Sequence, residues 1–326
     1  MSKVHEALKR AQEERSLAAP KVKNENGTHG VETPSAIVIP ALTSPVDLTK
    51  APASIAPTFA SAVIEHQPHA PAVGRDPKTG QFLRFEDLLN SCAEPAWILD
   101  PRSVLFCETD RPVSGTEQFR TLRTRLYNLR ETSPLKKVLV TSAMPGEGKT
   151  FVATNLAQAI ARERARRVLL IDADLRSPAL HRPLGAPLSP GISEYLRDQA
   201  TDVDIIQHGQ EGKLCFIAAG NGDKNPSELL SNGSFEKLLG RLAPLFDWVI
   251  IDSPPCLPVA DVNVLAGLCD GVLLVVRARS TPAAAAERAR KELQKRNVVG
   301  VVLNAVEENQ VHEAYYAAGY GQLKEG

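Results

Sequence analysis

The sequence predicts an α/β protein in which a mostly parallel β-sheet carries helices on both of its faces. Two observations predict it: strand-length runs alternate with longer helical segments, and the runs are apolar throughout instead of alternating with polar residues. The expected strands are Lys137–Thr141, Arg167–Asp172, Leu214–Ala218, Trp248–Asp252, Gly271–Val276 and Gly300–Asn304. Strands of this kind are buried on both faces of a sheet.

Helical periodicity fills the segments before and between these strands. The expected helices are Ser114–Arg130, Phe151–Arg164, Ile192–Arg197, Ser234–Pro244, Ala260–Leu268 and Pro282–Arg296. Right-handed crossovers between parallel strands bring every carboxyl-terminal strand end to one edge of the sheet. Ligands of open α/β sheets bind at that edge, so we expect the functional site there.

The first third of the chain has a different composition. Residues 1–16 predict a short helix, and residues 17–80 predict a disordered linker rich in proline and alanine. Residues 81–111 lead into the domain, with a short helix expected at Phe82–Leu89 and extended pieces at Ala96–Leu99 and Ser103–Phe106. The globular domain is expected over residues 112–306 and a tail over residues 307–326.

Bulk composition narrows the class of protein. Lys+Arg and Asp+Glu each number 38, so the balanced charge of the 326-residue chain argues against a nucleic-acid partner. The five cysteines form no C-x-x-C pair, so we expect reduced, mostly buried thiols. The sequence shows neither an apolar run of about 20 residues nor the apolar core of a signal peptide. We therefore expect a cytoplasmic protein that reaches a membrane only through a partner.

A phosphate-binding loop follows the first expected strand. The segment Thr141–Thr150 reads TSAMPGEGKT and precedes a helix, which is the strand–loop–helix context of a P-loop. Its glycines let backbone N–H groups approach phosphate, and Ala143 stands where the strict pattern has glycine. Lys149 is expected on the β- and γ-phosphates of ATP and Thr150 on Mg²⁺. The expected nucleotide-binding residues of this segment are Met144, Pro145, Gly146, Glu147, Gly148, Lys149, Thr150 and Phe151.

Acidic residues end two further strands. Asp172 and Asp174 follow the strand Val168–Ile171, and Asp252 ends the strand Trp248–Ile251. Because both strand ends should face the P-loop, we expect Thr150, Asp172 and Asp252 to hold Mg²⁺ directly or through water. Either Asp172 or Asp174 is then placed to accept a proton from an attacking hydroxyl. Asp at such junctions is otherwise a common helix N-cap.

The order of these motifs resembles the bacterial tyrosine kinases of capsule and exopolysaccharide systems, which belong to the MinD/ParA-like P-loop ATPases. The P-loop, Val168–Arg176 and Val249–Pro255 are similar to that family's three nucleotide-binding motifs, and the likeness covers about Gly115 to Val306. The resemblance implies a P-loop NTPase fold, ATP and Mg²⁺ as cofactors, and tyrosine autophosphorylation. It also implies that Arg176 steadies the site and that Asn304 contacts the adenine, with Arg277 as a weaker candidate.

The resemblance also extends to the two ends of the domain. Glu117, Arg120 and Arg123 match a Glu-x-x-Arg-x-x-Arg motif that lies at subunit contacts of a ring-like homo-oligomer in the family; the alternative is a solvated charged stripe. Three of the five tyrosines lie in the tail, where the family carries its autophosphorylation sites. They are Tyr315, Tyr316 and Tyr320. The alternative is that Tyr315 and Tyr316 pack on the last helix.

The same resemblance suggests partners and leaves rival functions. It implies a membrane-bound polysaccharide co-polymerase, or chain-length determinant, as activator at the inner face of the plasma membrane, and a tyrosine phosphatase as antagonist. Two rivals are a MinD/ParA-like ATPase switch and a nucleotide-controlled scaffold without kinase activity. Met144 and Pro145 stand where many MinD/ParA members carry a second lysine, which disfavours the switch.

Overall fold

The structure is a computed structural model that describes residues 37–40, 84–107, 115–163, 166–209, 212–222, 225–259 and 261–306. These ranges contain the expected globular domain except for its first three residues, 112–114, and short gaps. The expected N-terminal helix of residues 1–16, most of the linker and the tail with Tyr315, Tyr316 and Tyr320 lie outside the described residues.

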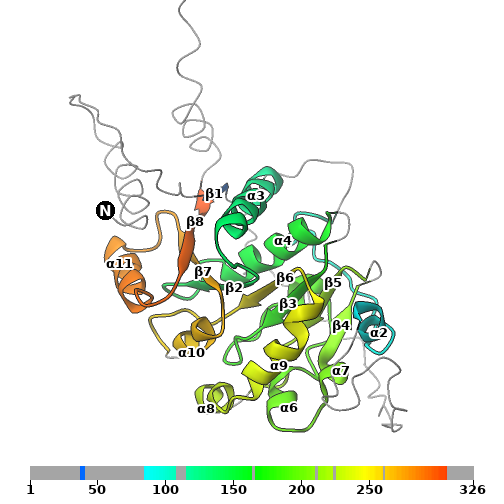
Figure 1. Ribbon diagram of the computed structural model, residues 1–326. Coiled ribbons are helices and arrows are strands. Elements are labelled where there is room, and N and C mark those ends of the chain that lie inside the picture. Colours follow the sequence, from blue (N-terminus) through cyan, green and yellow to red (C-terminus); the bar gives the residue numbers. More distant parts are fainter. Residues whose placement is uncertain are drawn as a thin grey trace, which may run out of the picture.

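One eight-stranded sheet forms the centre of the domain (Figure 1). The strands are β1 (Ile37–Pro40), β2 (Lys137–Ser142), β3 (Val168–Asp172), β4 (Ile206–His208), β5 (Leu214–Ile217), β6 (Trp248–Asp252), β7 (Gly271–Arg277) and β8 (Val298–Val306). Their spatial order is β1-β8-β7-β2-β6-β3-β5-β4. Every neighbouring pair is parallel except β4 with β5, as the alternation of apolar strands and helices predicts.

Helices cover both faces of this sheet (Figure 1). They are α2 (Phe85–Leu89), α3 (Thr116–Thr132), α4 (Lys149–Ala161), α5 (His181–Leu184), α6 (Ile192–Leu196), α7 (Asp202–Ile205), α8 (Pro226–Ser231), α9 (Ser234–Leu242), α10 (Asp261–Gly267) and α11 (Ala283–Glu292). A 3₁₀ turn, η1 (Ala243–Leu245), follows α9 at Pro244. Among the described residues, no helix combines the length and the apolar character that crossing a lipid bilayer requires.

Two apolar cores lie on the opposite faces of the sheet. Because successive side chains of a strand point to opposite faces, Leu139 packs in one core, with α9, α10 and α11, while Val138 and Val140 pack in the other, with α3 and α4. Helix α4 carries small and apolar residues on nearly every side, so it can be enclosed by its neighbours, and all of its side chains from Val152 to Ala161 are buried.

Three regions differ from the sequence-based prediction. Strand β1 lies within the expected disordered linker and pairs with β8 at the edge of the sheet, because backbone pairing with an open strand edge needs no apolar periodicity. The three-residue strand β4 is too short to produce a periodic pattern. The segments Ala96–Leu99 and Ser103–Phe106 form no strand; the N–H of Leu105 instead donates to the Asn155 side chain on α4 at 2.7 Å.

Candidate nucleotide site

The P-loop connects β2 to α4 and leaves backbone N–H groups free at the start of that helix. Gly146 and Gly148 have φ angles of +80° and +91°, which favour glycine because a side chain would be strained there. A Cβ atom at Gly148 would also lie 2.0 Å from Asn304 Nδ2, so any larger residue would have to displace the Asn304 amide. The space around Gly146 is open. The loop therefore has the form of an anion cradle at a helix N-terminus.

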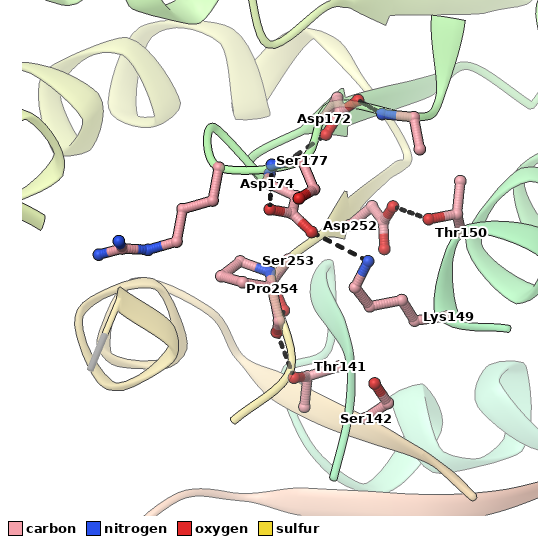
Figure 2. A network of polar contacts seen from close by, with 12 residues as sticks. Thr141, Ser142, Lys149, Thr150, Asp172, Asp174, Ser177, Asp252, Ser253 and Pro254 are labelled. Carbon is pink, nitrogen blue, oxygen red and sulfur yellow. Dashed lines mark hydrogen bonds and ion pairs between the residues drawn. The ribbon is translucent and has the colours of Figure 1, made fainter. Parts of the chain in front are cut away.

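Two carboxylates face this loop from neighbouring strands. Strands β3 and β6 are paired in a register that places Asp172 opposite Asp252 at their carboxyl ends. The Thr150 hydroxyl donates to Asp252 Oδ2 at 2.6 Å, and Lys149 Nζ lies 3.0 Å from Asp174 Oδ2 (Figure 2). The structure thus brings Lys149, Thr150 and all three predicted aspartates into one cluster.

Asp172 organises the loop that follows β3. Its Oδ2 accepts hydrogen bonds from the N–H groups of Ala179 and Leu180 at 3.0 Å each, and its Oδ1 accepts one from the N–H of Asp174 at 3.1 Å. The side chain is fully buried, and this burial, with the nearby Asp252 charge, raises the pKa of Asp172 to about 7 despite those hydrogen bonds. The carboxylates of Asp172, Asp174 and Asp252 thus repel one another, and a bound cation would relieve that repulsion.

Asp252 offers a buried oxygen atom for ligand binding. Burial raises the pKa of Asp252 to about 6, although the neighbouring Lys149 charge lowers it. Its buried Oδ1 has no hydrogen-bond partner among the described residues. Burial lowers the pKa of Lys149, but Asp252 and Asp174 outweigh it and leave that pKa above its ordinary value. The Asp252 Oδ1 atom, which lies beside the Thr150 hydroxyl and the Asp172 carboxylate, is the kind of oxygen ligand that Mg²⁺ prefers.

Two predicted nucleotide-binding residues hold the loop through their side chains. The Glu147 carboxylate is buried, and its Oε2 accepts a hydrogen bond from the N–H of Met144 at 2.8 Å. Asn304 was expected at the adenine, yet its Nδ2 donates to the backbone oxygen of Glu147 at 2.9 Å. The structure thus places the Asn304 amide against the P-loop backbone, because β8 ends beside that loop and the buried amide finds its acceptor there.

Met144 and Pro145 are exposed in the loop, and Phe151 packs at the start of α4. Met144 has an exposed side chain, and the hydroxyl of Ser142 donates to its backbone oxygen at 2.8 Å. The Phe151 ring packs edge-on against Phe119 of α3, with ring centroids 5.8 Å apart. Pro145 is exposed beside Gly146. The side chain of Phe151 therefore anchors α4 to α3.

Arg176 is held by a buried carboxylate outside the cluster. Its Nε donates to Asp261 Oδ2 at 2.7 Å, and its Nη2 donates to Asp261 Oδ1 at 3.1 Å and to the Ser227 hydroxyl at 3.0 Å. A guanidinium matches a carboxylate with two parallel hydrogen bonds, so the buried Asp261 of α10 captures it. In this structure Arg176 joins the loop after β3 to α8 and α10.

The three residues predicted for subunit contact separate into two groups on α3. Glu117 and Arg120 form an exposed ion pair. Arg123 turns to its own chain, where Nη1 donates to the backbone oxygen of Ala159 at 2.7 Å and Nη2 pairs with Glu163 at 3.0 Å. Only the first two side chains are therefore open to a neighbouring copy in this structure.

Sequence reasoning missed Thr281, gave no role to Asp261 and gave Arg277 another role. Thr281 donates to Glu147, and the Arg277 guanidinium donates to the backbone oxygen of Gly146 at 3.0 Å. Thr281 stands just after β7, the sheet neighbour of the P-loop strand, and this position was the available signal. Its recognition required the strand order, which the sequence did not provide.

Fold and site together define a P-loop nucleotide-binding protein. The family model for the CobQ/CobB/MinD/ParA nucleotide binding domain matches residues 138–321, more than half of the chain. The tyrosine-protein kinase YwqD of Bacillus subtilis is 35% identical over 192 residues, which cover 58% of this chain and 81% of the relative. The solved kinase domain of the Escherichia coli tyrosine kinase ETK has a TM-score of 0.59 and 32% identity, covering 68% of this chain and 94% of that domain.

The chain belongs to the bacterial tyrosine-protein kinases within the CobQ/CobB/MinD/ParA nucleotide-binding family. The match to the full-length tyrosine-protein kinase etk of Escherichia coli is 34% identical over 208 residues and spans only 28% of that relative. The similarity therefore covers most of YwqD but less than a third of etk.

Proposed function

We propose that the protein is an ATP-dependent tyrosine autokinase that phosphorylates the tail tyrosines of a neighbouring copy. The observation that carries the proposal is the cluster of Lys149, Thr150 and three aspartates beside an open P-loop. Phosphoryl transfer depends mainly on positioning and on neutralising charge, and this cluster offers a fixed cation and oxygen ligands for a metal.

ATP and Mg²⁺ are the cofactors that suit this arrangement. The N–H groups of Gly146 and Gly148 and the Lys149 ammonium would hold phosphate oxygens. Thr150 and Asp252 would hold Mg²⁺, with the free Asp252 Oδ1 as a further ligand or as the acceptor from a metal-bound water. Asp172 would join through Oδ1, which accepts a hydrogen bond from the N–H of Asp174 at 3.1 Å. Bound Mg²⁺ would neutralise the charge of the triphosphate.

Asp174 is the better candidate for the proton acceptor. Asp172 accepts backbone hydrogen bonds on both of its oxygens, whereas Asp174 Oδ2 is directed at Lys149 Nζ, where the γ-phosphate would lie. ATP would draw Lys149 toward the phosphates and release Asp174 Oδ2 for the tyrosine hydroxyl. A base within hydrogen-bond reach of both groups satisfies the geometric requirement for proton transfer.

The proposed substrate and assembly are those of related bacterial tyrosine kinases. Tyr315, Tyr316 and Tyr320 would be the phosphorylated residues, and the exposed Glu117 and Arg120 would contact the next copy in a ring. The reaction would regulate the synthesis and export of exopolysaccharide or capsule. A membrane-bound chain-length determinant would recruit and activate the cytoplasmic kinase at the inner face of the plasma membrane, and a tyrosine phosphatase would reverse the reaction.

Incubation of the purified protein with γ-labelled ATP and Mg²⁺ tests the proposal. We expect label on the tail tyrosines of the wild type, and a loss of at least about 100-fold in Lys149→Met, because this change removes the charge that faces the phosphates. Arg197→Met is the matched control, since its guanidinium donates to Gly222 O outside the cluster. Free phosphate without labelled protein would instead identify an ATPase switch. Nucleotide-dependent assembly without either product would identify a scaffold.

A further inference from the structure

The buried carboxylate of Glu147 links the P-loop backbone to the turn after β7. Glu147 lies within the loop, yet only 3% of its surface is exposed. Its Oε2 accepts the N–H of Met144 at 2.8 Å, and its Oε1 accepts the hydroxyl of Thr281. A negative charge inside a loop that receives a triphosphate is unfavourable unless hydrogen bonds hold it away from the phosphates. Its two donors therefore matter for more than the packing of the loop.

Thr281 is itself fixed in one orientation. The N–H of Arg277 donates to Thr281 Oγ1 at 3.0 Å, so the hydroxyl oxygen is occupied as an acceptor and its proton is directed to Glu147. Thr281 lies in the turn between β7 and α11, far from the P-loop in sequence. The hydrogen bonds from Arg277 to Thr281 and from Thr281 to Glu147 thus connect the end of β7 to the P-loop.

Further contacts from β7 and β8 act on the same backbone. Arg277 Nη1 donates to Gly146 O at 3.0 Å, and Asn304 Nδ2 donates to Glu147 O at 2.9 Å. These donors occupy the carbonyl oxygens of adjacent loop residues. The carbonyl groups are thereby turned toward β7 and β8, which leaves the opposite side of the loop for N–H groups and phosphate.

We propose that Glu147 and Thr281 are positioning residues that keep the P-loop in its nucleotide-receiving shape before the nucleotide arrives. Thr281 holds the Glu147 carboxylate on the Met144 N–H and away from the phosphates. Loss of the Thr281 hydroxyl frees the carboxylate, which then repels the triphosphate and leaves the loop less ordered. This inference rests on the proposed nucleotide-binding function and assigns a role to a residue outside the motif.

Equilibrium binding of a fluorescent ATP analogue with Mg²⁺ to the full chain tests this role. We expect Thr281→Val to raise Kd about tenfold, since a hydrogen bond to a charged group is lost. Thr281→Ser keeps the hydroxyl and stays within about twofold of the wild type. At saturating ATP the rate of tail labelling in Thr281→Val stays within about threefold, because the change acts on binding and not on the transferred group.

A double-mutant cycle identifies Glu147 as the residue through which Thr281 acts. In the Glu147→Ala background, Thr281→Val should change Kd by less than about twofold, because no carboxylate remains to be held. Thr132→Val is the matched control. The Thr132 hydroxyl donates to Leu129 O at the end of α3, and the Kd of the variant should equal that of the wild type.

The outcomes separate this inference from the proposed function. A wild type that binds no nucleotide refutes the proposed function itself. A wild type that binds, together with Thr281→Val of equal Kd or with fully additive effects in the cycle, refutes the positioning role alone. A fall in melting temperature of Thr281→Val with unchanged Kd would show that the hydroxyl only stabilises the fold.

Discussion

At the residue scale, the site depends on a lysine that is already paired before any nucleotide binds. Lys149 Nζ contacts Asp174 at 3.0 Å, and its side chain is 14% exposed. A nucleotide phosphate must therefore compete with this carboxylate for the ammonium group. The exchange of one anion for the other would place the released carboxylate next to the γ-phosphate, so binding and proton acceptance involve the same contact.

This competition gives a prediction for Asp174→Asn. Removal of the negative charge frees Lys149 and reduces repulsion of the triphosphate, so the KM for ATP should fall about threefold or more. Loss of the proposed base should lower kcat by about 100-fold or more. Steady-state labelling of the tail measures both. Asp198→Asn is the control, because Asp198 is exposed with φ +58°, a backbone conformation that asparagine tolerates. An unchanged kcat would exclude Asp174 as the base.

At the element scale, helix α3 has an inner and an outer function. Its buried residues Phe119, Leu122 and Leu126 pack into the core beside α4, and Arg123 ties its middle to the end of α4. The ion pair of Glu117 and Arg120 stands in solvent and adds little to stability. The Glu-x-x-Arg-x-x-Arg motif is thus divided between holding the domain together and presenting charge outward.

We predict that substitutions in this motif separate assembly from stability. Arg120→Ala should reduce the oligomer mass measured by light scattering while the urea midpoint of the dissociated protein stays unchanged. Arg123→Ala should lower the free energy of unfolding by about 1–3 kcal/mol, because the Ala159 oxygen and the Glu163 carboxylate lose a charged donor. Arg120→Ala with the mass of the wild type would remove Arg120 from the subunit contact.

At the scale of the whole molecule, the sheet order brings the site, the last strand and the N-terminal strand together. Strand β8 carries Asn304 against the P-loop, receives β1 on its outer edge and ends at Val306, after which the tail begins. Tyr315 lies nine residues beyond Val306, so an extended chain reaches about 30 Å. The proposed reaction between copies would require the tail to reach a neighbouring site within such a distance.

A mixing experiment tests transfer between copies. Lys149→Met protein, which keeps its tyrosines, is incubated with a size-tagged active copy in which Tyr315, Tyr316 and Tyr320 are phenylalanine. We expect label on the Lys149→Met copy at a rate that rises with the concentration of the active copy. Each copy would instead phosphorylate itself if tyrosine label formed only in unmixed wild type and if the rate per molecule did not change on dilution.

Much of the fold could be predicted because buried parallel strands leave an unmistakable pattern. Strand β6 was predicted with its observed bounds, and β2 and β7 to within one residue at their carboxyl ends. The P-loop and the acids at two strand ends follow from local sequence, since parallel strands share one functional edge. Strand β1 was missed because its pairing depends on the open edge of β8, which local sequence does not describe.

Site residues whose role depends on a distant partner were predicted less well. Arg176 was correctly placed in a motif, yet Asp261, 85 positions away in the chain, determines where its guanidinium points. Asn304 was expected at the adenine, and its amide contacts the P-loop backbone, a position that only the folding of β8 beside the loop reveals. Thr281 carried no motif at all and acquires significance only through its bond to Glu147.

The sequence by itself determined the α/β class, the phosphate loop and the acidic strand ends, because each is encoded in residues that are neighbours in the chain. The tertiary structure decided the order of the strands, the pairing of Asp172 with Asp252 in register, and the orientation of every charged side chain around Lys149. The physical reason is that a buried charge takes its position from the partners that compensate it, and folding brings those partners together from distant parts of the chain.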